Sequence, residues 1–142
     1  YKYFNINWSY FNKGVVMKVL SIKEPWASLI MNGTKKIETR SWKTKYRGEI
    51  YIHASLSKAK ITKPEVYELI KDMNFKCGYI ICKCNLVDCI YMTDEYVNDM
   101  KTNHYEEYIC GHYEVGRYAW IVEDVKVIEP IEAKGKLGLW NY

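Results

Sequence analysis

Strand patterns outnumber helix patterns in this chain, and this imbalance limits the folds open to it. Residues 49–54 alternate strictly, with isoleucine and alanine on one face and polar or aromatic side chains on the other. Residues 18–22 have a short strand pattern, and 78–91 and 118–129 have long ones, the last expected to end at Pro130. Glycines interrupt a closing strand near the C-terminus. The chain is therefore expected to form mainly a β-sheet.

Three short helices are expected between the strands. Residues 25–32 begin with a proline and are followed by a glycine, which are typical helix start and stop signals. Residues 63–73 carry an apolar stripe after a capping-box pair, Thr62 and Glu65. Residues 94–101 form the third, and the stretch from 102 to 116 is expected to be loop. The prediction is an α+β domain, a small curved β-barrel with flanking short helices.

The length supports one domain. The chain has 142 residues, of which 49% are hydrophobic, enough for a single core. Residues 1–16 carry six aromatics without a clear period, and we interpret them as an extraneous or flexible segment before a domain at 17–142. A genuine strand that covers an apolar surface is the alternative. No apolar run reaches the length of a membrane span, so no membrane partner is expected.

Charge and cysteine content narrow the partners and the compartment. Residues 17–63 contain eleven Lys and Arg against three acidic residues, so a polyanion would favour this half, although a solubilising lysine face explains the same excess. The sequence run rich in cations beyond residue 40 comprises Lys43, Lys45, Arg47, Lys58, Lys60 and Lys63. Five cysteines form no CxxC pair, which favours a reducing cytoplasm, and no metal site or cofactor is expected.

The segment from Gly33 to Arg40 carries the densest chemistry. If residues 36–40 are extended, Lys36, Glu38 and Arg40 project to one side and Ile37 faces the core. A carboxylate between cations can hold a base by hydrogen bonds or activate water, and a surface ion-pair ladder is the structural alternative.

These residues resemble the G-x-K-x-x-E-x-R signature of the ASCH domain family, in the PUA-like β-barrel superfamily. Several other segments resemble that family in the same order, and the resemblance covers about residues 17–140. They are Leu20–Ala27, Arg40–Trp42, Tyr51–Ser55, Gly116–Trp120 and Gly135–Trp140.

The resemblance implies a cleft beside the barrel that binds RNA or modified nucleobases. Some family members are amidohydrolases that deacetylate acetylated cytidine, and their catalytic lysine matches Lys35. They carry a threonine nucleophile where this chain has Glu38. A later glutamate is also used, for which Glu106 and Glu107 are the candidates here. Without the threonine, Glu38 would act as general base while Lys35 or Arg40 stabilises the oxyanion.

Aromatic side chains supply candidate stacking surfaces. Trp26 and Trp42 flank the signature and are the preferred ones, whereas Trp120 lies inside a long strand and is expected in the core. His53, at the polar face of its strand, is expected to support the cleft as a hydrogen-bonding side chain.

The predicted function is binding of RNA or a modified nucleobase in a basic, aromatic-lined cleft. Lys35 and Glu38 are the catalytic pair if the protein is an enzyme. The expected binding residues are Trp26, Lys36, Arg40, Trp42 and His53. The alternatives are an amidohydrolase acting on acetylated cytidine, another RNA-processing activity, and a protein-interaction adaptor whose acidic second half faces its partner.

Overall fold

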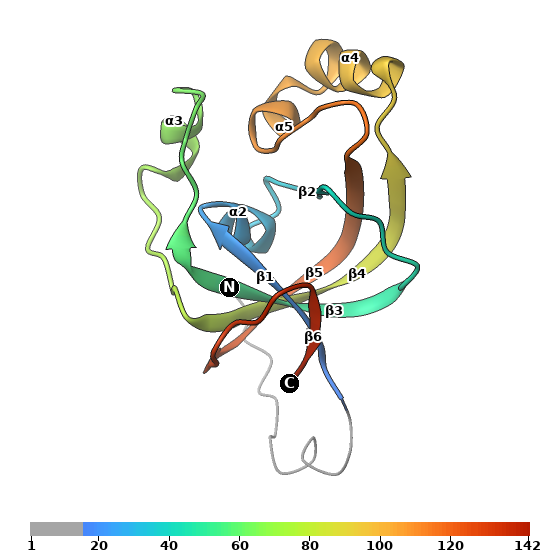
Figure 1. Cartoon of the computed structure of the whole chain (residues 1–142). Helices are drawn as coiled ribbons and strands as arrows, with labels where there is room; N and C mark the ends of the chain where they lie inside the picture. Colours follow the sequence, from blue (N-terminus) through green and yellow to red (C-terminus); the bar gives the residue numbers. More distant parts are fainter. Residues whose placement is uncertain (1–15) are drawn as a thin grey trace.

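A six-stranded sheet forms the body of the protein in the computed structural model, which describes residues 16–142 (Figure 1). Its strand order is β2-β5-β4-β3-β1-β6. The bounds are β1 Lys18–Glu24, β2 Ile37–Arg40, β3 Gly48–Lys58, β4 Tyr79–Tyr91, β5 Tyr118–Glu132 and β6 Leu139–Asn141. The N-terminal segment predicted at residues 1–16 lies, except for Val16, outside the described residues.

Four helices in the described residues connect the strands. They are α2 Trp26–Met31, α3 Val66–Ile70, α4 Asp94–Asn103 and α5 Tyr105–Ile109. Figure 1 shows α2 inside the curve of the sheet, with α3 and α5 at the open end above it. No helix in residues 16–142 is long and apolar enough to cross a membrane.

Two predicted boundaries are wrong for identifiable reasons. The last long strand does not end at Pro130 but continues to Glu132, because the proline falls in an irregular stretch of the β4–β5 ladder. A proline is tolerated there, since no ladder hydrogen bond needs its missing N–H. The predicted helix at 63–73 is only α3, whose N-cap is Glu65, the expected partner of Thr62 in the capping box, and whose N-cap makes no side-chain hydrogen bond.

One predicted loop is partly helical. Thr93 caps α4 by accepting a hydrogen bond from the amide of Tyr96, and α5 follows directly after the end of α4 at His104. Because α5 places Ile109 and Cys110 in a small core with Leu29 of α2, the segment after it is held above the sheet. Tertiary packing, rather than local pattern, stabilises this five-residue helix.

The largest core cluster lies inside the curve of the sheet (Figure 1). Alternating side chains of β3 are buried against α2 and against Trp120, which is fully buried as expected. The mixed α and β class is therefore confirmed.

Closure of the sheet into a barrel is not confirmed. The edge strands β2 and β6 share no ladder in the described part of the chain. Instead, the Arg40 side chain of β2 donates from Nη2 to the carbonyl oxygen of Ser21 in β1, at 2.8 Å. The edge of β1 beyond Leu20 is not covered by β6, because their ladder spans only three residue pairs. A side chain thus connects β2 to the uncovered edge of β1, where a closed barrel would need backbone pairing.

Candidate functional site

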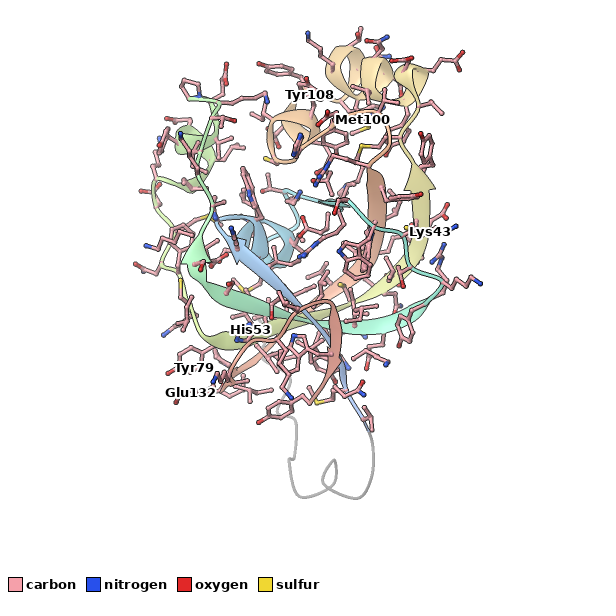
Figure 2. The ribbon with its side chains drawn as sticks, viewed as in Figure 1. Lys43, His53, Tyr79, Met100, Tyr108 and Glu132 are labelled. Atoms are coloured by element: carbon pink, nitrogen blue, oxygen red, sulfur yellow. The ribbon has the colours of Figure 1, made fainter. Side chains whose placement is uncertain are left out.

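A cleft of about 1040 Å³ opens between these two edges of the sheet. Its lining comes from β1, α2, β2 and the two residues after it, β3, α3 and the segment before it, α5, the α5–β5 connection and residues 134–138. Tyr108 and His53, both in this lining, lie well apart in Figure 2. A concave site of this size, at the junction of several elements, is a typical ligand site.

The lining is strongly cationic. It contains seven Lys and Arg side chains and a single carboxylate, Glu38. The seven are Lys23, Arg40, Lys60, Lys63, Arg117, Lys134 and Lys136. Only Lys60 and Lys63 belong to the cation-rich run noted in the sequence, while Lys43 points away from the cleft (Figure 2). The fold therefore gathers cations from both halves of the chain at one cleft, which favours an anionic ligand.

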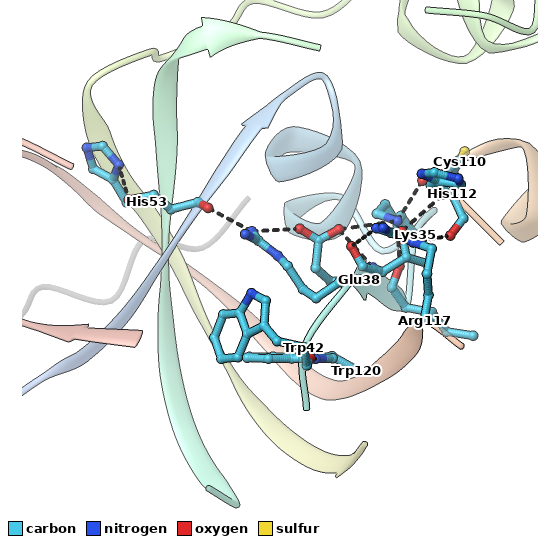
Figure 3. A network of polar contacts seen from close by, with 12 residues as sticks. Lys35, Glu38, Trp42, His53, Cys110, His112, Arg117 and Trp120 are labelled. Carbon is cyan, nitrogen blue, oxygen red and sulfur yellow. Dashed lines mark hydrogen bonds and ion pairs between the residues drawn. The ribbon is translucent and has the colours of Figure 1, made fainter. Parts of the chain in front are cut away.

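Glu38 and Arg40 form the polar wall of the cleft, as the alternation of β2 predicts. Arg40 Nη2 donates to Glu38 Oε2 at 3.0 Å and to the Ser21 carbonyl, while Glu38 Oε1 accepts from the amide of Thr39 at 3.1 Å. Figure 3 shows these contacts within a network that extends from His53 to Cys110. Glu38 is only 6% exposed, so this carboxylate is presented in a fixed orientation.

Lys35 lies behind this wall and does not line the cleft. It is 1% exposed, and its Nζ donates to the carbonyl oxygens of Ile37 and Cys110 at 2.5 and 2.6 Å. Glu38 Oε1 lies 3.8 Å from Nζ, and the ring centroid of Trp26 lies 5.7 Å from it. The ammonium group is thus held by two hydrogen bonds and an ion pair with protein groups. In this arrangement Lys35 connects β2 to the α5–β5 connection and holds Glu38 ionically.

Of the two candidate glutamates, Glu107 is the one that the fold brings to the signature segment. Its Oε1 accepts from the amide of Lys36 at 2.6 Å, and burial raises the pKa of its carboxyl, although Lys35 nearby opposes the rise. Glu106 is exposed. The Lys36 side chain is also exposed and outside the cleft lining, because its position at the start of β2 directs it to solvent.

The two tryptophans chosen as stacking candidates both line the cleft but differ in exposure. Trp42 is 37% exposed, and its ring meets Trp120 edge-on with centroids 4.7 Å apart. Its carbonyl oxygen also accepts from Trp120 Nε1 at 3.2 Å, which fixes its backbone. Trp26 is half-buried and packs against two core clusters. Trp42 therefore presents the more accessible aromatic surface.

His53 is a buried residue of the cleft lining. Its Nε2 donates to the Ala133 carbonyl oxygen at 2.7 Å, which leaves Nδ1, 3.1 Å from Ser21 Oγ, to accept from that hydroxyl. Ser21 Oγ in turn accepts from Trp140 Nε1 at 3.0 Å. With 1% exposure, His53 contacts β1 and the residues before β6 and supports the cleft wall from within.

The sequence prediction missed the α5–β5 wall of the cleft. The amide of His112 donates to Thr39 Oγ1 at 3.0 Å, and Arg117 Nε donates to the His112 carbonyl oxygen at 3.0 Å. A side chain at Gly111 would lie 2.9 Å from Thr39 Cγ2, so only glycine permits this approach. These residues stand more than seventy positions from β2, and no local motif connects them to it.

Tyr113 is a second missed residue of this wall. It is 8% exposed, burial raises the pKa of its hydroxyl, and it therefore stays protonated. Its hydroxyl has no hydrogen-bond partner in the described structure.

Two buried cysteines of the described residues remain in the thiol form. Burial raises the pKa of Cys110 to about 11 and that of Cys84 to about 12, so both are thiols rather than nucleophilic thiolates at neutral pH. No group of three or more metal-ligating side chains occurs in residues 16–142.

The fold and the site together describe a small domain with a curved mixed sheet and a cationic cleft, one wall of which is the signature segment. Residues 20–132 match the model of the ASCH domain, and the chain belongs to this family. The crystal structure of ASCH from Zymomonas mobilis superposes with a TM-score of 0.53 over 82% of this chain and 73% of that one, at 20% identity. At this identity the likeness concerns the fold.

Two curated relatives match one half of the chain. Activating signal cointegrator 1 from Homo sapiens is 35% identical over 81 residues, and the protein of the same name from Mus musculus is 35% identical over 84 residues. The match covers 50% of this chain but only 14% of either relative. The similarity is therefore confined to one domain of much longer proteins.

Proposed function

We propose that this domain binds RNA, or a modified nucleobase within it, in the cleft between β2 and β1. The observation that carries the proposal is the lining, in which seven cations and one buried carboxylate surround exposed aromatic surface. Cations hold phosphates without regard to sequence, and an aromatic face stacks on a base. The family resemblance supports the same function, and the five free cysteines suit a reducing compartment such as the cytoplasm.

Within this proposal the two kinds of residue have separate tasks. Cleft-lining lysines that reach solvent, such as Lys60 and Lys134, are here called rim lysines, and they contact the backbone of the RNA strand. Trp42 stacks on one base, and Glu38 accepts a hydrogen bond from its amino group. Because the Thr39 amide and Arg40 already hold the two oxygens of Glu38, little conformational entropy is lost when the base binds.

Hydrolysis of acetylated cytidine is the second candidate. Glu38 is the only carboxylate in the lining, and Arg40 beside it is a cation able to stabilise an oxyanion. Lys35 supports this candidate less than the sequence suggested, because its ammonium group is committed to two carbonyl oxygens behind the wall. Binding without turnover is therefore the function that the geometry favours.

Titration with a single-stranded RNA over a series of salt concentrations tests binding. We expect log K to fall linearly with log salt, with a slope of about 0.7 for each phosphate contacted. Trp42→Ala should weaken binding by about 1–3 kcal/mol. Lys45→Gln, which changes an exposed lysine outside the cleft, is the matched control and should leave affinity almost unchanged. Salt-independent binding, or none at low salt, would favour the protein adaptor instead.

Incubation with acetylated cytidine, free and in RNA, followed by mass spectrometry separates binding from hydrolysis. We expect no deacetylation by the wild-type protein. Turnover that disappears in Glu38→Gln would replace the binding proposal with the hydrolase.

A further inference from the structure

Two leucines are exposed at the cleft. Leu137 is 99% exposed and Leu56 is 78% exposed, the highest values among the large apolar side chains in residues 16–142, and both belong to the cleft lining. An exposed leucine forgoes the stabilisation that burial would bring, and isolated cases are common on protein surfaces. Two at the mouth of one ligand cleft indicate contact with the ligand.

The segment that carries Leu137 is fixed at its base. His53 Nε2 donates to the Ala133 carbonyl oxygen, and the amide of Ala133 donates to the Gly78 carbonyl oxygen at 3.1 Å. Gly135 packs so closely on His53 that a Cβ there would lie 2.8 Å from His53 Cε1. Directly after Leu137 and Gly138 the chain enters β6, which pairs with β1. The leucine thus projects from an anchored support.

Lysines lie close to both leucines in the sequence and line the same cleft. Lys134 and Lys136 precede Leu137 in the same segment, while Lys60 follows Leu56, and all three line the cleft. An apolar side chain between cations matches a nucleic-acid strand, whose bases offer apolar faces and whose phosphates are anionic. The lining contains one carboxylate, Glu38, that would repel a phosphate.

We propose that Leu137 is a wedge that separates the base in the cleft from its stacked neighbour. The substrate class is then a base within a stacked or paired strand, rather than a free nucleoside, and Leu56 contacts the strand on the other side of the mouth. This inference rests on the proposed nucleic-acid binding. Taking a base out of a stack is costly, and proteins that do so insert apolar side chains into the step that opens.

The test uses a short RNA that contains 2-aminopurine, either as a single strand or annealed to its complement. This analogue fluoresces more strongly when it leaves the stack. Affinity and fluorescence are measured for the wild type, for Leu137→Ser, and for Val87→Ser, which changes an exposed apolar residue outside the cleft lining. Because Leu137 is fully exposed, its replacement leaves the core intact.

We expect the wild type and Val87→Ser to raise the fluorescence of the paired RNA. Leu137→Ser should abolish this rise and bind the paired RNA roughly tenfold more weakly, while its affinity for the single strand changes by less than about twofold. Equal losses for both RNAs, or no loss for either, would overturn the wedge while leaving RNA binding intact. Leu137-dependent binding to phosphatidylserine vesicles, with RNA binding unaffected, would overturn it in favour of a membrane surface. If the wild type binds neither RNA, the proposed function itself fails.

Discussion

Among the lysines that lie over aromatic rings in the described residues, Lys35 and Lys63 occupy opposite environments. Lys35 Nζ is 5.7 Å from the centroid of Trp26, and Lys63 Nζ is 5.1 Å from that of Tyr108. Lys35 is fully buried behind the cleft wall, whereas Lys63 is half-buried at the cleft. The same kind of contact therefore occurs both inside the protein and where a ligand can reach it.

The difference between them separates structure from recognition. A buried ammonium must have all its protons satisfied, so Lys35 is bound to two carbonyl oxygens and placed near Glu38. A cation at the rim keeps part of its hydration and remains available to a phosphate. We therefore expect changes behind the wall to affect folding stability, and changes at the rim to affect ligand affinity.

The largest expected effect is the loss of the buried cation. Lys35→Met should lower the free energy of unfolding by about 3–5 kcal/mol, because Glu38 and two carbonyl oxygens lose their partner. Urea denaturation measures it. Lys63→Met is the matched control, and we expect it to stay within about 0.5 kcal/mol of the wild type. Equal stabilities for the two variants would contradict the comparison.

Arg40 tests whether the wall depends on a side chain that connects two strands. Arg40→Lys should lower the free energy of unfolding by about 1–3 kcal/mol, because a shorter ammonium does not reach both Ser21 and Glu38 in the same geometry. Arg47→Lys changes an exposed arginine and should have little effect. Thermal unfolding of both variants shows whether the Arg40 contacts stabilise the fold more than an ordinary surface contact does.

The rim lysines should act on binding alone. Lys63→Gln and Lys134→Gln should each reduce the salt slope of single-stranded RNA binding by about 0.7, because each removes one phosphate contact. Their unfolding free energies should remain within about 0.5 kcal/mol of the wild type. An unchanged slope with lower affinity would show that these side chains act without contacting phosphate.

The smallest expected effect concerns Glu107. Burial raises the pKa of this carboxyl in the folded protein, so the folded state binds more protons than the unfolded state between the ordinary and the raised pKa. Its contribution to stability therefore falls as pH increases through that interval. Glu107→Gln should flatten this part of the stability profile, measured by denaturation from acidic to neutral pH. The exposed neighbour offers a control, since Glu106→Gln should leave the profile unchanged.

Much of this fold could be predicted from local pattern. The alternation of residues 49–54 indicated β3, and the extended spacing of 36–40 placed Glu38 and Arg40 on one face, where the structure has them. Helix α5 could not be predicted in this way, because a five-residue helix owes its stability to the core that Ile109 and Cys110 join.

Local sequence patterns were sufficient to predict the long strands, the family signature and the excess of basic residues in the first half. The three-dimensional structure was needed to show that Lys35 lies behind the cleft wall, that Glu107 reaches the amide of Lys36, and that Lys134 and Lys136 share the cleft with Lys60. This division arises because side-chain alternation is a local property of the backbone. Burial and the meeting of charges depend on contacts between residues far apart in the chain.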